Sequence, residues 1–325
     1  MPQTSMSSRG VPMSAGTAGL AGAVVPRRRS SLFATGQERL YVLLLLPVAV
    51  MLVALIAWPI VLTVELSLYD VRLFDAVRNR TGAMSLDAFA KILSSPNFYG
   101  SLWHTAFYVV VSTALAFVWG LATAVLVNAR FPARKAARLL IVTPWIIPSA
   151  IASLIWMFLF DGHVGLINYF LMKLGLVDAP ITFLVNYNWA IWTVIIASAW
   201  KSYPFFTIML LSGMQSISRT YYEAAVLDGA SRWRRFLDIT LPGLRNIIAV
   251  TAFLSALSAF REVETILILT GGGPARATET LSLMIYNETF EAYRAGQGAA
   301  LGVIAFLLSF LLMTFGFRRM MKDFF

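Results

Sequence analysis

Apolar residues in this chain gather in six long runs that are separated by shorter polar segments. A helix needs about 20 apolar residues to cross the hydrocarbon core of a bilayer, and each run is about that long. The pattern therefore predicts an all-α polytopic membrane protein with six transmembrane helices, at residues 41–66, 101–127, 139–160, 189–213, 244–270 and 298–317.

The first 38 residues have a different composition, rich in Ser, Gly, Ala and Pro and with the run Arg27-Arg28-Arg29. Such a segment cannot bury enough apolar surface to offset the entropy of ordering it. A cleaved signal peptide is the alternative, but the following apolar run is too long for a signal core. We expect a disordered tail at 1–38, a six-helix domain at 39–320 and a short tail at 321–325.

Most of the 26 Lys and Arg residues lie on one side of the predicted spans: in the first tail, around residues 130–138, within 216–245 and after residue 317. Because positively charged residues favour the cytoplasmic side, both termini and the segment 216–242 are predicted to be cytoplasmic. This topology accounts for the formal net charge of +10 better than nucleic-acid binding does.

The composition narrows the chemistry further. Hydrophobic residues make up 58% of the chain and charged residues 13%, which is abnormal for a single soluble core. The absence of cysteine excludes disulfides and thiolate metal sites, and the two histidines, His104 and His163, are too far apart in the sequence for a histidine cluster. We therefore expect no metal, no catalytic residue and no cofactor bound by this chain.

The polar segment 216–242 has the pattern of two short helices. Thr220 and Glu223 have the spacing of a capping box at the start of the first helix. Asp228-Gly229 can supply the left-handed turn that ends this helix, and Ser231 can cap the second. A folded helix pair is therefore expected between the fourth and fifth apolar runs.

The second helix of this pair has Trp233, Phe236 and Leu237 on one face, at i, i+3, i+4 spacing. Pro242 is expected to end it before the fifth run. From the residues alone two interpretations stay open: an amphipathic loop that lies on the bilayer, or a helix pair that docks into a groove of another protein.

A specific set of residues in this segment changes that balance, namely Glu223, Ala224, Ala225, Asp228, Gly229, Ala230, Leu241 and Pro242. Their order and spacing resemble the EAA loop of permease subunits of binding-protein-dependent ABC importers. The loop after the fifth run, with Gly271, Gly272, Gly273 and Pro274, is similar to the outer loop of carbohydrate-type permeases, in particular those of the maltose F type. The resemblance implies the type I ABC importer permease fold.

The resemblance also implies partners. In that family an extracytoplasmic binding protein delivers the solute, two permeases form the path, and two ATP-binding cassette subunits hold ATP and Mg. It therefore implies a heterodimer with a second permease and an ATPase-docking role for 216–242, in the cytoplasmic (inner) membrane. The only lysine followed by a hydroxyl residue is Lys201, and Trp200 precedes it, so no phosphate-binding loop is present. We expect a transport subunit without an ATPase site.

Charged residues inside the apolar runs suggest a substrate path. A lysine such as Lys201 costs about 2.5–3.5 kcal/mol at the centre of a membrane helix unless it has partners. Arg261 and Glu264 have the i, i+3 spacing that allows an ion pair along one helix face. The candidate path residues are Lys201, Tyr203, Phe260, Arg261, Glu262 and Glu264. A structural ion-pair network between two permeases is the alternative interpretation.

The family resemblance favours a carbohydrate as the imported solute, with a disaccharide such as trehalose or maltose expected first. Glycerol phosphate or another small polar solute is the alternative. A secondary transporter is a further alternative, but it would need inverted repeats and coupling-ion sites, and the sequence has no obvious internal repeat.

Overall fold

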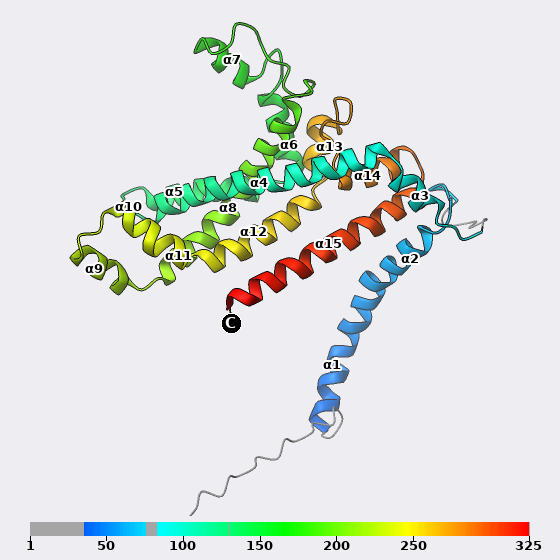
Figure 1. The fold of residues 1–325 in the computed structure, drawn as a ribbon, viewed down its shortest axis with the longest axis horizontal. Helices are drawn as coiled ribbons and strands as arrows, with labels where there is room; N and C mark the ends of the chain where they lie inside the picture. Colours follow the sequence, from blue (N-terminus) through cyan, green and yellow to red (C-terminus); the bar gives the residue numbers. More distant parts are fainter. Residues whose placement is uncertain (1–35, 76–82, 130, 325) are drawn as a thin grey trace, which may run out of the picture. The chain divides into compact units, whose positions relative to one another are not determined.

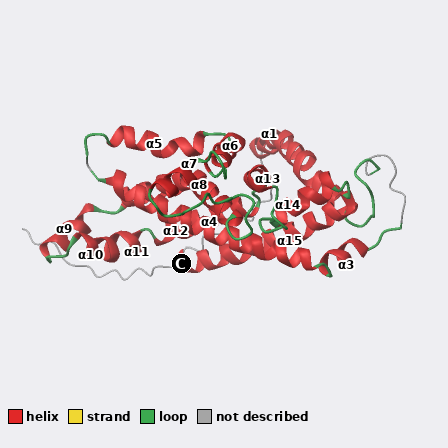
Figure 2. Ribbon diagram, turned by 90° about the horizontal axis from the view of Figure 1, so that it is seen from above, coloured by secondary structure: helices red, strands yellow, loops and turns green. Residues whose placement is uncertain are grey.

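The computed structural model describes residues 36–75, 83–129 and 131–324, and these form helices, turns and loops without a β-strand (Figures 1 and 2). The predicted all-α class is confirmed. The chain divides into two compact units, Met1–Ala57 and Trp58–Phe325, and each is described by itself. Residues 1–35, most of the predicted tail, lie outside the described residues.

In the first unit, α1 (Gly36–Leu52) is followed by a π-helix, η1 (Val53–Ala57). From residue 43 onward the side chains of both are exposed within the protein. The stretch Leu43–Leu66, which includes α2 (Trp58–Leu66), is long and apolar enough to cross a membrane. This agrees with the first predicted span, and it makes lipid or a protein partner the natural surrounding for these side chains.

The second unit is organised around two long helices that pack along each other, α4 (Pro96–Asn128) and α8 (Ala190–Ser216). Ala116 and Ala124 on α4 are fully buried, and a Cβ added at Gly120 would overlap the Cβ of Phe206 on α8. Small residues of this kind let membrane helices approach closely. The packing therefore follows from the residues that α4 places toward α8.

Two further helices complete this bundle. Figure 1 shows α12 (Arg245–Phe260) beside α4 and α8, and α15 (Ala295–Phe324), which contacts α12 and α2. Helices α4 and α8 and the stretch Ala295–Thr314 of α15 have the length and hydropathy of membrane spans. The second, fourth and sixth predicted spans are confirmed.

The third predicted span, 139–160, is not one continuous helix. It consists of α5 (Arg134–Ile146) and α6 (Ser149–Leu159), which are bent by 98° relative to each other. The break falls at Ile147-Pro148, where Ile147 is extended, with φ −64° and ψ 130°. A residue before proline is disfavoured in the helical conformation, and proline has no N–H to continue the ladder.

The fifth predicted span, 244–270, is also interrupted. Helix α12 ends at Phe260, and α13 (Glu264–Thr270) begins after a short break. The expected ion pair of Arg261 with Glu264 along one helix face is wrong, because the helix stops between them and the ion pairs among the described residues do not include it. Arg261 Nε instead donates to the Leu257 carbonyl at 3.4 Å.

The loop after α6 is held by local hydrogen bonds. Asp161 Oδ1 accepts from the backbone N–H groups of His163 at 2.7 Å and Val164 at 2.9 Å. These donors, Val164 foremost, hold the pKa of the Asp161 carboxyl below its ordinary value. Asn168, buried on α7 (Leu166–Lys173), exchanges two hydrogen bonds of 2.9 Å with the backbone of Ile181.

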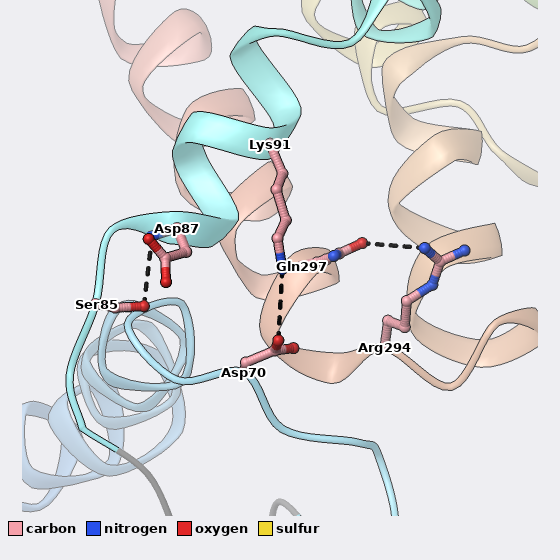
Figure 3. Close-up of polar contacts among 6 residues, drawn as sticks. All are labelled: Asp70, Ser85, Asp87, Lys91, Arg294 and Gln297. Atoms are coloured by element: carbon pink, nitrogen blue, oxygen red, sulfur yellow. Dashed lines mark hydrogen bonds and ion pairs between the residues drawn. The ribbon is translucent and has the colours of Figure 1, made fainter.

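Short helices pack against the N-terminal part of α15, namely α3 (Asp87–Leu93), α14 (Leu281–Tyr286) and the π-helix η3 (Asn287–Glu291). Figure 3 shows the polar contacts in this region. Lys91 Nζ lies 3.6 Å from an Asp70 carboxylate oxygen, and Arg294 Nη1 donates to Gln297 Oε1 at 3.4 Å. Acidic and basic side chains pair on this surface, as Lys91 does with Asp70 and Arg294 with Glu288.

Candidate functional site

A cavity of about 340 Å³ with many hydroxyl side chains in its lining lies between α4, α5, α8, α12 and the start of α13. Most of its polar lining consists of hydroxyl side chains, which membrane helices carry where they pack closely together. Hydroxyl groups both donate and accept hydrogen bonds, so they suit a ligand that is itself rich in hydroxyls. The hydroxyl residues are Tyr108, Ser112, Thr113, Ser198, Ser202, Ser255, Ser258 and Thr265.

Lys201 lines this cavity from α8 and is satisfied by backbone rather than by a carboxylate. Its Nζ donates to the Ile147 carbonyl at 2.6 Å. That carbonyl belongs to the break between α5 and α6, where the chain leaves the helical conformation. The lysine therefore joins α8 to the broken third span, which explains how a charged group is accommodated there.

Two further contacts order the cavity wall, and one buried hydroxyl in it has no partner. The Tyr108 hydroxyl donates to Ser198 Oγ at 2.8 Å, which links α4 with α8. Glu262 Oε1 accepts from the backbone N–H of Thr265 at 2.9 Å and so caps α13. Thr113 Oγ1 is buried without a hydrogen-bond partner among the described residues. An unsatisfied buried hydroxyl favours a ligand that supplies its partner.

Two aromatic rings add apolar surface to the same cavity. Trp145 and Phe205 both line it, and their ring centroids are 6.2 Å apart with a tilt of 40°. Aromatic faces beside convergent polar groups are typical of small-molecule sites. The cavity can thus offer both stacking surface and hydrogen bonds.

The structure brings together only part of the path predicted from the sequence. Lys201 and Glu262 line the cavity. Tyr203 does not: its ring packs edge-on against Trp119. Phe260 is only 7% exposed and belongs to the apolar core rather than offering a stacking face.

The two remaining residues of the predicted path, Arg261 and Glu264, are exposed and do not line the cavity. The hydroxyl residues that line the cavity were not predicted from the sequence, because the predicted path was based mainly on charged residues. A signal was present: Ser198, Ser202 and Phe205 recur at helical spacing on α8.

The glycine-rich loop forms a well-packed turn. Gly271 and Gly272 have φ values of 59° and 88°, which favour glycine. Glu279, which follows the loop, is 3% exposed. Its Oε2 lies 3.2 Å from Arg276 Nη1 and accepts from Ser101 Oγ, also at 3.2 Å. This buried carboxylate ties the loop to α4, a role that its sequence position on a loop did not indicate.

The segment 216–242 forms a helix pair, as predicted, with α9 (Arg219–Leu227) and α10 (Arg232–Arg235). The N-cap of α9 is Ser218, whose Oγ accepts from Thr220 N at 3.4 Å, so the expected capping box at Thr220 is wrong by two residues. Gly229 has φ +75°, and Ala230 N donates to Ala225 O at 2.8 Å, which confirms the left-handed helix end. Ser231 caps α10 as expected, accepting from Arg234 N at 3.2 Å.

The second helix continues further than expected. A π-helix, η2 (Phe236–Thr240), and α11 (Leu241–Gly243) follow α10 directly, so Pro242 lies within helical structure and does not end it. The chain bends by 63° before α12 instead. Proline is tolerated here because it occupies the first turn of α11, where its missing N–H is not required.

The tip of this helix pair exposes apolar side chains. Leu227 is 89% exposed and Trp233 68%, with Tyr221 and Val226 also exposed. Glu223 and Ala224 are exposed on α9 as well. Behind the tip, the Tyr222 and Thr240 hydroxyls are 2.9 Å apart and join α9 to η2. Exposed apolar side chains on a helix pair held by a hydrogen bond are typical of an interaction surface.

Comparisons with known proteins agree with this architecture. Residues 116–322 match the family described as binding-protein-dependent transport system inner membrane component. The trehalose/maltose transport system permease protein MalF of Thermococcus litoralis is 32% identical over 289 residues, which cover 88% of this chain and 96% of that protein. The sulfoquinovosyl glycerol transport system permease protein SmoG of Agrobacterium fabrum is 32% identical, with coverages of 84% and 88%.

Among solved structures, a bacterial ABC transporter involved in the import of the acidic polysaccharide alginate has a similar fold. The TM-score is 0.74 at 23% identity, with 88% of this chain and 96% of that chain covered. The chain therefore belongs to the family of binding-protein-dependent transport system inner membrane components. Its fold is the type I ABC importer permease fold that the sequence predicted.

Proposed function

We propose that this chain is a transmembrane permease subunit of an ATP-driven importer of a carbohydrate. The observation that carries the proposal is the hydroxyl-lined cavity with its two aromatic rings, in a chain of this family. A sugar presents hydroxyls for hydrogen bonding and apolar ring faces for stacking, and the cavity offers a partner for each. The relatives named for trehalose/maltose and for sulfoquinovosyl glycerol support a sugar-containing solute.

The solute is best described as a disaccharide such as trehalose or maltose. A phosphate ester such as glycerol phosphate is the second candidate, since Lys201 could pair with a phosphate. The balance of charge favours the neutral sugar, because Glu262 lines the same cavity and Lys201 already donates to a carbonyl. An anionic solute would meet the repulsion of that glutamate.

The family and the exposed helix pair support a proposal for the partners. We refer to residues 216–242 as the coupling loop and assign it the docking of an ATPase subunit at the cytoplasmic face, with ATP and Mg held by the ATPases. A second permease would complete the path, and an extracytoplasmic binding protein would deliver the sugar. The apolar tip at Leu227 and Trp233 supports the docking role. Large exposed apolar side chains that lie together are typical of surfaces that a partner covers.

The docking role is tested by Leu227→Asp. A buried, unpaired carboxylate in an interface is strongly unfavourable, so ATPase copurification with the permease should fall at least tenfold. The matched control is Leu174→Asp, which introduces the same side chain at a site that is 70% exposed but follows α7, on the side predicted to be extracytoplasmic.

Pull-down from solubilised membranes, with permease level quantified by blot, measures both variants. Loss of ATPase in Leu227→Asp alone supports docking at the coupling loop. Equal ATPase recovery in the two variants would remove this surface from the interface.

A further inference from the structure

A second cavity, of about 690 Å³, lies at the base of the coupling loop, between α4, α5, α8, α9 and η2. Three arginines line it: Arg134 and Arg138 from α5, and Arg219 from α9. We call it the arginine cavity. Its other polar lining residues are uncharged, and no carboxylate of the described residues is among them: Asn128, Gln215, Tyr222 and Thr240. The cavity therefore concentrates positive charge in one concave site.

The charge of these arginines is not neutralised within the protein. None of the three takes part in an ion pair among the described residues. Arg134 Nε donates to the Val127 carbonyl at 2.6 Å, which positions that side chain but leaves its charge uncompensated. Arg138 Nε is buried with no hydrogen-bond partner in the described part of the chain. A buried guanidinium N–H without a partner is costly, so an anionic ligand that accepts from it would relieve that cost.

An apolar cavity of about 250 Å³ adjoins the arginine cavity and shares two of its lining residues, Arg138 and Gln215. Its walls come from α4, α5 and α8 and are mainly aliphatic, with Ile141, Val142, Ile208 and Leu211. A polar, cationic compartment and an aliphatic one thus meet at Arg138. This arrangement matches an amphiphile with an anionic head and a hydrocarbon chain.

We propose that this pair of cavities binds an anionic phospholipid, with its phosphate in the arginine cavity and part of an acyl chain against the aliphatic walls. Guanidinium groups bind phosphate oxygens through paired, charge-assisted hydrogen bonds. Basic pockets between transmembrane helices on the cytoplasmic side are suited to anionic headgroups. The adjoining aliphatic cavity favours a lipid over free phosphate, which has no chain to fill it.

The position of the lipid gives it a structural effect. Arg219 and Tyr222 belong to α9, whereas Arg134 and Arg138 belong to α5. A phosphate between them would bridge the coupling loop to the broken third span. The lipid would brace the coupling loop from behind, on the side away from its exposed tip. This inference does not depend on which solute is transported.

The experiment uses the full chain, purified in mild detergent with its copurifying partners. It is incubated with equal amounts of phosphatidylglycerol and phosphatidylcholine of identical acyl chains, washed, and its bound lipids are quantified by mass spectrometry. Wild type should retain phosphatidylglycerol over phosphatidylcholine. Arg138→Gln and Arg219→Gln should each lower this retention by about tenfold, as expected for loss of one charge-assisted contact.

Arg245→Gln is the matched control: it removes the same charge from an exposed arginine at the start of α12 that does not line either cavity. Because Arg219 is exposed, its substitution should not impair folding, which circular dichroism would check. Equal losses in all three variants, or equal retention of the two lipids, would overturn the proposal. So would displacement of phosphatidylglycerol by inorganic phosphate at similar concentration, because the site would then recognise a free anion.

Discussion

Glu262 has two roles that a single substitution can separate. One carboxylate oxygen caps α13 through the backbone N–H of Thr265, and the side chain also lines the hydroxyl-lined cavity. A glutamine can keep the cap, because its amide oxygen accepts the same hydrogen bond, but it lacks the charge. The effect of the charge on transport can therefore be measured without removing the contact that orders the helix.

We expect Glu262→Gln to lower the rate of sugar uptake by about tenfold, since a hydrogen bond to a charged group contributes roughly 1.5–3 kcal/mol. Glu264→Gln is the control, because Glu264 is exposed, lies on the same segment and does not line the cavity. Uptake of labelled sugar by the assembled transporter in liposomes measures both. If the two variants transport alike, Glu262 does not belong to the path.

At the scale of elements, the coupling loop depends on a backbone conformation as much as on contacts. Gly229 has φ +75°, and a Cβ added there would meet no atom within 4 Å. The requirement for glycine is therefore conformational rather than steric. Gly100, on α4, also has no atom within 4 Å of an added Cβ, but it lies in an ordinary helix.

The same substitution should therefore have opposite effects at these two sites. Gly229→Ala should destabilise the end of α9 by about 1 kcal/mol and reduce ATPase copurification, because alanine disfavours the left-handed conformation. Gly100→Ala should be neutral or stabilising by about 0.5–1 kcal/mol, because alanine favours the helix. Thermal unfolding and pull-down compare them; a stable, fully coupled Gly229→Ala protein would contradict this description of the loop.

Continuous membrane helices could be predicted from the sequence, whereas the positions at which a helix breaks could not. The continuous helices α4, α8 and α15 were recognisable because each carries a long apolar run, which in α8 continues on both sides of Lys201 and Pro204. The break at Pro148 was not, since Pro47, Pro144 and Pro204 all lie inside continuous helices. The presence of a proline alone therefore does not mark a break in this chain. The gap after Phe260 coincides with Arg261 and Glu262, whose charges were interpreted as part of a continuous span.

The candidate site shows the same division. The coupling loop is a local motif, so its residues could be identified from their order and spacing in the chain. The hydroxyl-lined cavity forms only when α4, α8, α12 and α13 come together, and beyond the spacing of Ser198 and Ser202 on α8 its hydroxyl residues share no local pattern. Charge drew attention to Lys201 correctly, because a lysine in an apolar helix requires a partner. It also drew attention to Arg261, which lies outside the cavity.

For the whole molecule, the proposal assigns the solute path to this chain and a second permease, and the use of ATP to separate subunits. In the proposed function, the chain would supply half of a path and a surface that receives force from a separate ATPase. The cytoplasmic position of the coupling loop and of the tails at 1–38 and 321–325 remains a prediction from the distribution of Lys and Arg. The proposed coupling needs this orientation, because ATP is available only on that side.

Reconstitution in liposomes tests whether transport through this chain depends on a separate ATPase. The chain is purified alone or with the second permease, both ATPases and the binding protein, and accumulation of labelled disaccharide against a gradient is measured with ATP present. Accumulation is expected only for the complete assembly, and it should be lost when the ATPases are omitted. Concentration of the sugar by this chain alone, with no ATPase present, would contradict the account.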